Sequence, residues 1–271
     1  MPLRIDDTFR DALASQTGET GRPLAGMWVC SGSPLVAELC AGSGLDWLLV
    51  DAEHSPNGLE SILAQLQAIH GYPVHTVVRP PVNDTVLIKQ YLDLGVQNLL
   101  VPMVNSAAEA EAAVAATRYP PQGLRGVGSA LARAARWNRV PDYLARAGET
   151  ISVTVQIEST AAVDSVQDIL KVDGVDAIFV GPSDLASSMG LLGQQEHPEV
   201  SAAVEHCLAA AKAAGKPAGV NAFKPDTARH YLDHGANFIL VGADVALLAR
   251  GSEALAAKYV TTRDGDTPTS Y

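Results

Sequence analysis

Charged side chains stand at the ends of several apolar segments of this chain. Charges in such positions either take part in catalysis or binding, or form ion pairs with one another. Asp51, Arg79, Glu158 and Asp184 each stand at or just beyond the end of an apolar, β-branched run. A charge there costs desolvation free energy unless it is paired or bound to a metal. A purely structural domain has little reason to carry four of them, so these residues indicate a binding or catalytic site.

Glu158 and Asp184 are candidate metal ligands. Two carboxylates without a neighbouring Cys or His suit a hard divalent cation, such as Mg²⁺ or Mn²⁺, that keeps positions for water and a chelating substrate. The alternatives are an ion pair, or capping by Asp184 of a helix that begins at Leu185. Gln156 lies two positions before Glu158, so along a strand the two side chains face the same side.

His54 and Arg79 are candidates for acid–base and electrostatic roles. Asp51 precedes His54 by three residues, and a carboxylate can orient one imidazole nitrogen while the other acts as a base. The alternative is a surface histidine. Arg79 can stabilise a developing oxyanion or form an ion pair with a neighbouring strand end. The remaining histidines are interpreted as structural: His70, His75, His197, His206, His230 and His234.

Eight short apolar segments must position these side chains, and they recur about every 31 residues, the length of one βα unit. We predict strands at Leu24–Cys30, Trp47–Glu53, His75–Pro80, Asn98–Met103, Ser152–Glu158, Ala177–Gly181, Pro217–Asn221 and Phe238–Ala243. Segments with helical periodicity lie between them, at Leu59–His70, Ala107–Thr117, Ala161–Leu170 and Val200–Ala214. Gly95 and Gly215 are expected just beyond helix ends. The α/β pattern predicts a (β/α)₈ TIM barrel, with polar strand ends meeting at its carboxyl-terminal face. An open, doubly wound sheet is the alternative.

One domain is expected over residues 1–260, followed by a disordered tail at 261–271 that is rich in Thr and Gly. The step from the fourth to the fifth strand is longer than a βα unit requires, which indicates a functional or interface insertion. The insertion contains Arg125, Arg133, Arg136 and Arg139. These cations are either a solvated face or a site for an anion or another subunit.

Composition excludes several classes of protein. Apolar residues are 47% of the 271 residues, and the formal net charge is −11. The first value is typical of a folded domain, and the second argues against nucleic acid or an anionic membrane as the main partner. We see no secretion signal and no apolar run of membrane-spanning length, and three scattered cysteines suit a reducing compartment, so a cytoplasmic location is expected. No lysine falls in a predicted strand, which disfavours a Schiff-base mechanism.

Together, these strand ends resemble the HpcH/HpaI aldolases, metal-dependent class II pyruvate aldolases. The resemblance runs from about residue 26 to about residue 249 and is carried by an ordered set of motifs: Asp51-Ala52-Glu53-His54-Ser55-Pro56-Asn57, Arg79-Pro80, Val101-Pro102-Met103-Val104, Arg118-Tyr119-Pro120-Pro121, Arg125-Gly126-Val127-Gly128, Gln156-Ile157-Glu158-Ser159 and Gly181-Pro182-Ser183-Asp184-Leu185. It implies a barrel of the phosphoenolpyruvate/pyruvate-binding type. The implied reaction is reversible cleavage of a 4-hydroxy-2-oxo acid into pyruvate and an aldehyde.

The resemblance also implies roles for individual residues. Glu158 and Asp184 ligate Mg²⁺, Mn²⁺ or Co²⁺, and the 2-oxo acid completes the coordination with water. Its carboxylate rests on backbone N–H groups near Ser183 and Asp184, and Gln156 lines the same pocket. Arg79 faces the keto oxygen, while His54, paired with Asp51, supplies acid–base chemistry.

Two further residues are expected near the acceptor side of the site, the part that binds the aldehyde. Trp28 matches an aromatic residue found near the pocket in the family. Asn221 stands where better-known members have an apolar residue, so a polar aldehyde is expected. The alternative is that Asn221 only hydrogen-bonds a neighbouring loop.

Family members are commonly hexamers, trimers of dimers that exchange C-terminal helices, and Val245–Val260 is the matching element here. Two other functions stay open: a citrate lyase-like acyl-CoA lyase and a non-catalytic barrel.

Overall fold

The structure is a computed structural model that describes residues 5–16 and 21–260. Eight parallel strands form a closed barrel in which each strand pairs with its neighbours in sequence and β8 pairs with β1. The strands are β1 (Leu24–Val29), β2 (Trp47–Asp51), β3 (His75–Arg79), β4 (Asn98–Val101), β5 (Ser152–Ile157), β6 (Ala177–Val180), β7 (Ala218–Asn221) and β8 (Phe238–Ala243). The predicted (β/α)₈ barrel is therefore confirmed, and the open-sheet alternative is wrong.

Alternation along each strand separates the core into two layers. In β2, Trp47 and Leu49 join the cluster inside the barrel, whereas Leu48 and Val50 join the larger cluster between strands and helices. Successive side chains of a strand point to opposite faces, so Asp51 continues the inward row. By the same parity the inward rows of β1, β3, β5 and β7 end in Trp28, Arg79, Gln156 and Asn221, which therefore meet at the carboxyl end of the barrel.

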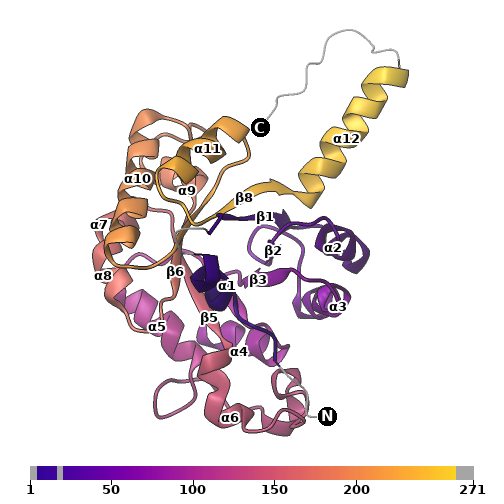
Figure 1. Cartoon of the computed structure of the whole chain (residues 1–271), viewed down its shortest axis with the longest axis vertical. Helices are drawn as coiled ribbons and strands as arrows, with labels where there is room; N and C mark the ends of the chain where they lie inside the picture. Colours follow the sequence, from indigo (N-terminus) through magenta and orange to yellow (C-terminus); the bar gives the residue numbers. More distant parts are fainter. Residues whose placement is uncertain (1–4, 17–20, 261–271) are drawn as a thin grey trace.

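The amino end of the barrel is closed by α1 (Phe9–Gln16), which Figure 1 shows against the strands. The Phe9 ring lies 5.1 Å from Trp47 and 5.3 Å from Phe238, centroid to centroid, and both partners are first residues of strands. The Phe9 backbone N–H donates to Asn98 Oδ1 at 2.7 Å. This end is thus filled by aromatic packing, which leaves the opposite end for chemistry.

Helices follow the strands, and most of them cover the barrel from outside (Figure 1). They are α2 (Pro34–Ala41), α3 (Leu59–Ile69), α4 (Thr85–Asp93), α5 (Ala107–Thr117), α6 (Tyr143–Arg146), α7 (Thr160–Asp164), α8 (Val166–Lys171), α9 (Pro182–Ser188), α10 (Pro198–Ala213), α11 (Pro225–Asp233) and α12 (Asp244–Tyr259). Gly95 and Gly215 follow the caps of α4 and α10 with φ of 93° and 69°, as expected of residues beyond helix ends. The single helix predicted at Ala161–Leu170 is divided into α7 and α8. Within the described ranges, no helix combines the length and apolarity needed to cross a membrane.

The insertion before β5 packs at the amino end of the barrel, because it follows α5 and helices return to that end. Arg125 is fully buried there, with Nη2 3.0 Å from Asp93 Oδ1 and its guanidinium 4.7 Å from the Tyr119 ring. Arg133 Nη1 donates to the Leu94 carbonyl at 2.7 Å. These two arginines therefore hold the insertion to α4, and the four arginines do not act as one exposed cluster.

The last described helix, α12, leaves the barrel and extends away from it (Figure 1). Asp244 anchors its first turn, because its carboxylate accepts hydrogen bonds from the backbone N–H groups of Cys30 at 2.8 Å and Ser31 at 3.0 Å. Beyond Asp244 the helix has no buried side chain, and Leu247 and Leu248 are 64% and 71% exposed. The tail predicted to be disordered, 261–271, lies outside the described residues.

Candidate active site

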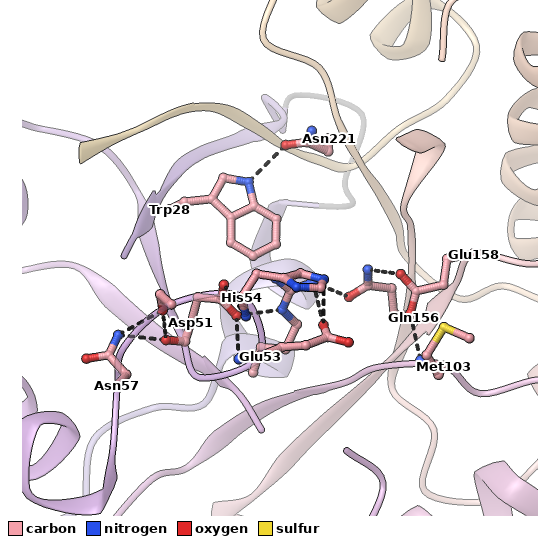
Figure 2. A network of polar contacts seen from close by, with 11 residues as sticks. Trp28, Asp51, Glu53, His54, Asn57, Met103, Gln156, Glu158 and Asn221 are labelled. Carbon is pink, nitrogen blue, oxygen red and sulfur yellow. Dashed lines mark hydrogen bonds and ion pairs between the residues drawn. The ribbon is translucent and has the colours of Figure 1, made fainter. Parts of the chain in front are cut away.

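Arg79 contacts Trp28, Asp51, Glu53 and Gln156 and so occupies the centre of a polar network at the carboxyl end of the barrel; these four partners are labelled in Figure 2. Parallel pairing aligns Asp51 at the end of β2 with Arg79 at the end of β3. Arg79 Nε donates to Asp51 Oδ1 at 2.8 Å, and Arg79 Nη1 lies 2.8 Å from Glu53 Oε2. The side chains of Arg79 and Asp51 are 5% and 2% exposed, so this ion pair is shielded from water.

The Arg79 guanidinium also lies over an aromatic ring. Its Cζ atom is 4.3 Å from the centroid of Trp28 on β1. Trp28 Nε1 in turn donates to Asn221 Oδ1 at 2.9 Å (Figure 2). Four strands therefore fix one planar cation, and a guanidinium fixed in this way is preorganised for an oxyanion.

The predicted pairing of Asp51 with His54 is wrong. Asp51 accepts from Arg79 and from the backbone N–H groups of Glu53 at 3.0 Å and His54 at 3.2 Å. The His54 imidazole is instead 65% exposed, with Nε2 3.9 Å from Glu53 Oε2. The reason is local: Asp51 ends the strand pointing inward, and the turn that follows carries the His54 side chain outward.

Glu53 is therefore a site residue to which no role was assigned from the sequence. It lies between Arg79 and His54, and burial raises its pKa above the ordinary value, against the lowering effects of Arg79 and His54. The signal for it was present, because Glu53 is two residues from Asp51 and shares its parity. Asn57 supports this turn by donating from Nδ2 to the Asp51 carbonyl oxygen at 2.6 Å.

Glu158 lies at the end of β5 and is 2% exposed. Its Oε1 accepts from the backbone N–H of Met103 at 2.7 Å, and its Oε2 accepts from Gln156 Nε2. Met103 has a φ of 53°, uncommon for a side chain of this size. This backbone donor was not foreseen, because a peptide N–H has no signature in the sequence.

A cluster of carboxylates surrounds Glu158. Burial raises its pKa to about 7, and the charges of Glu53 and Asp184 push it in the same direction, against the Met103 N–H and Arg79. Asp184, in the first turn of α9, is exposed, and its carboxylate forms no hydrogen bond with the described residues. Glu53 and Glu158 thus lie near the Arg79 guanidinium, and the charge of Asp184 acts on both carboxylates.

This donor set fits a divalent cation. Carboxylate oxygens are the ligands that Mg²⁺ and Mn²⁺ prefer, and a cation would offset the repulsion that raises the Glu158 pKa. Gly181, before α9, leaves the space clear: a Cβ atom there would lie 3.1 Å from Glu158 Oε2 and 3.0 Å from Gln156 Nε2. The predicted ligands Glu158 and Asp184 are therefore near one another in a suitable environment.

The structure brings most of the predicted site residues to this end of the barrel. Trp28, Asp51, Gln156, Glu158 and Asn221 lie in one region (Figure 2). Arg79 connects this region through its contacts with Asp51, Trp28 and Gln156. The charge of Asp184 acts on Glu158 and Glu53. Ser183 precedes Asp184 in the first turn of α9 and is exposed. His54 lies at the margin.

Known proteins resemble this chain along most of its length. The family described as HpcH/HpaI aldolase/citrate lyase matches residues 24–251. A 4-hydroxy-2-oxo-heptane-1,7-dioate aldolase of Salmonella dublin is 53% identical over 255 residues, which are 94% of this chain and 95% of that protein. A hydroxypyruvate/pyruvate aldolase of Deinococcus radiodurans is 54% identical over 261 residues, 95% of this chain and 92% of that protein. An HpcH/HpaI aldolase/citrate lyase family structure from Burkholderia cenocepacia J2315 is 39% identical, with a TM-score of 0.87, and the match covers 93% of this chain and 98% of that one.

Proposed function

Because the chain belongs to the HpcH/HpaI aldolase/citrate lyase family, we propose that it reversibly cleaves a 4-hydroxy-2-oxo acid into pyruvate and an aldehyde. It is a carbon–carbon lyase of the class II pyruvate aldolases. The observation that carries this conclusion is the closeness of a buried, strand-fixed Arg79 to the carboxylates of Glu53 and Glu158, on both of which the charge of Asp184 acts.

Glu158 and Asp184 would hold the divalent cation, for which Mg²⁺, Mn²⁺ and Co²⁺ are the candidates. A cation bound there supplies a Lewis acid that stabilises negative charge on the oxo acid. Glu158 takes part only as a carboxylate, so it must lose its proton before it binds. Met103 and Gln156 hold its two oxygens in place meanwhile. Gln156 and Ser183 line the pyruvate half of the substrate.

Arg79 stabilises the enolate that forms when the C3–C4 bond breaks. Its Nε is engaged by Asp51 and its Nη1 by Glu53, while Trp28 lies against one face of the guanidinium. These partners hold the cation in one orientation before substrate binds. Charge stabilisation by a group that needs no reorganisation is worth most in the transition state.

His54 is the proposed base that takes the proton of the C4 hydroxyl. Its orienting carboxylate is Glu53 and not Asp51. Its exposure suits exchange of the proton with solvent after the aldehyde leaves. Removal of His54 should slow cleavage of the C3–C4 bond and leave the binding of Mg²⁺ by the carboxylates intact.

Trp28 and Asn221 would form the acceptor side of the site. Asn221 Oδ1 is engaged by Trp28, whereas its Nδ2 donates to no described residue. A free amide donor offers a hydrogen bond to an oxygen of the aldehyde. The arrangement therefore favours a hydroxylated or otherwise polar aldehyde over an aliphatic one.

We also propose a hexamer, a trimer of dimers in which α12 is exchanged between two copies of the chain. The support is the projection of α12 from its own barrel with Leu247, Leu248 and Leu255 exposed. Exchange would cover these side chains. A reducing, cytoplasmic compartment is supported by the three free thiols of Cys30, Cys40 and Cys207.

The test is pyruvate release from a panel of 4-hydroxy-2-oxo acids, with Mg²⁺ or with a chelator. We expect pyruvate and an aldehyde in equal amounts, and a much slower reaction for His54→Ala. Cleavage of an acyl-CoA thioester in place of the oxo acids would favour the citrate lyase-like function. No turnover of either class would favour a non-catalytic barrel.

A further inference from the structure

A second group of metal-ligating side chains lies on the outside of the barrel. Glu205 comes from α10, His230 from α11, and His234 caps the end of α11. One ligating atom from each residue lies within 4.8 Å of the others. From the sequence, both histidines were interpreted as structural.

Helix geometry brings the two imidazoles together. His230 and His234 are four residues apart and so lie on one face of α11, with ring centroids 4.2 Å apart. His230 Nε2 is 2.8 Å from Glu205 Oε1, and His234 Nε2 is 3.9 Å from Glu205 Oε2. In a tetrahedral site with bonds of about 2.1 Å, neighbouring ligand atoms are about 3.4 Å apart. The two observed separations lie on either side of that value.

A backbone contact orients the second imidazole. His234 Nδ1 lies 2.7 Å from the carbonyl oxygen of His230, so Nδ1 carries the proton and donates it. A neutral His234 then directs the lone pair of Nε2 towards Glu205. Metal-binding histidines are commonly held in this way, with one nitrogen donating to a carbonyl and the other free to ligate. The competing explanation is an ordinary ion pair of Glu205 with a protonated His230 or His234.

We propose that Glu205, His230 and His234 form a second cation site, for Zn²⁺ or a similar borderline metal ion. Imidazole ligands suit Zn²⁺, Ni²⁺ and Cu²⁺ and do not suit Mg²⁺, unlike the carboxylates around Glu158. The two histidine side chains are each 43% exposed, which leaves water for the fourth position. The bound ion joins α10 to α11 and stabilises the folded chain. This site stands independently of the proposed aldolase reaction.

The experiment counts Zn²⁺ bound to the metal-stripped full-length protein by equilibrium dialysis and elemental analysis. We compare the wild type with His230→Ala, His234→Ala and Glu205→Gln. His206→Ala is the matched control, because His206 is an exposed histidine next to Glu205 on α10. Each ligand variant should bind one Zn²⁺ fewer per chain, or bind that ion at least about 10–100-fold more weakly.

The control variant should bind like the wild type, and all four variants should retain wild-type activity with Mg²⁺. Zn²⁺ should also raise the melting temperature of the wild type more than that of His234→Ala. Equal Zn²⁺ binding and equal melting-temperature shifts in the wild type, His234→Ala and His206→Ala would show that the cluster is only an ion pair.

Discussion

Arg79 is the residue whose partners most narrowly define its role. Replacement by Ala should lower kcat by about 10²–10³-fold, since the charge meets an oxyanion that exists only during the reaction. The affinity for the divalent cation should change far less. Steady-state kinetics and metal titration measure the two effects, with the exposed Arg139→Ala as the control.

Loss of Arg79 also leaves Asp51 buried without a cation, so Arg79→Lys is the companion variant. It keeps a charge beside Asp51 but loses the planar group that lies over Trp28. It should fold and still lose most of kcat. A near-normal kcat in either correctly folded variant contradicts the role assigned to Arg79.

Glu158, as a proposed metal ligand, should couple metal binding to pH. Burial, together with Glu53 and Asp184, raises its pKa to about 7, against Arg79 and the Met103 N–H. A proton must therefore leave when the cation binds below pH 7, and affinity should fall about tenfold per pH unit between pH 6 and 5. Titration with Mn²⁺ between pH 5 and 8 measures this.

Two further observations check the assignment of that pH dependence. Glu158→Gln should bind Mn²⁺ weakly, and its affinity for Mn²⁺ should depend less on pH. In the metal-free protein, a pKa raised above the unfolded value means that stability is lost as pH rises through about 7. An Mn²⁺ affinity that stays constant down to pH 5 would be inconsistent with the raised pKa.

Asn221 governs the choice of aldehyde if its free amide meets the substrate. Asn221→Leu should shift kcat/KM towards aliphatic aldehydes by about tenfold or more, because a buried amide donor without a partner costs about 1–3 kcal/mol. Trp28→Phe is the control, since it breaks the Trp28–Asn221 hydrogen bond and keeps the amide. Equal losses for polar and aliphatic aldehydes would make Asn221 structural.

At the scale of elements, α12 carries the proposed contact between copies of the chain. Leu247→Ser combined with Leu248→Ser should reduce the hexamer to smaller species, because these side chains are exposed on their own barrel. Light scattering coupled to size-exclusion chromatography measures the mass. Leu192→Ser is the matched control, with a leucine that is 79% exposed in the loop after α9. An unchanged mass in the double variant argues against exchange.

Strands and helices were predictable from the sequence where their pattern of apolar residues was long enough to recognise. Each of the eight strands was predicted within a few residues, since a run such as Trp47–Asp51 is apolar on both faces. The short helix α6 in the insertion was not predicted, because four residues carry no periodicity. The insertion was expected to be a functional or an interface element; it packs at the amino end through Arg125 and Arg133. The position of the insertion follows from the direction in which α5 runs, and that direction is known only from the three-dimensional fold.

The candidate site was predictable in its residue types but not in its pairings. Parity along β5 correctly placed Gln156 beside Glu158. Asp51 was assigned to the nearby His54, whereas strand register pairs it with Arg79. Register is a property of two strands, so distance along one strand cannot reveal it. The contact of Trp28 with Asn221 joins the first strand to the seventh and likewise requires the closed barrel.

At the scale of the whole molecule, the two ends of the barrel differ in composition and in role. Aromatic packing of Phe9 against Trp47 and Phe238 fills the amino end, while polar groups from β1, β2, β3, β5 and β7 gather at the carboxyl end. Active sites of such barrels lie at the carboxyl end. The central claim is therefore that this end of the barrel stabilises the enolate of pyruvate with a divalent cation.

Exchange of the pyruvate methyl protons with deuterium, followed by proton NMR, tests that claim most directly, because the exchange requires the enolate and no aldehyde. With Mg²⁺ the wild-type enzyme should catalyse exchange, a chelator should abolish it, and added Mg²⁺ should restore it. Borohydride in the presence of pyruvate should not inactivate the enzyme. Exchange that persists in the chelator and is abolished by borohydride would contradict the account and show a Schiff base on lysine.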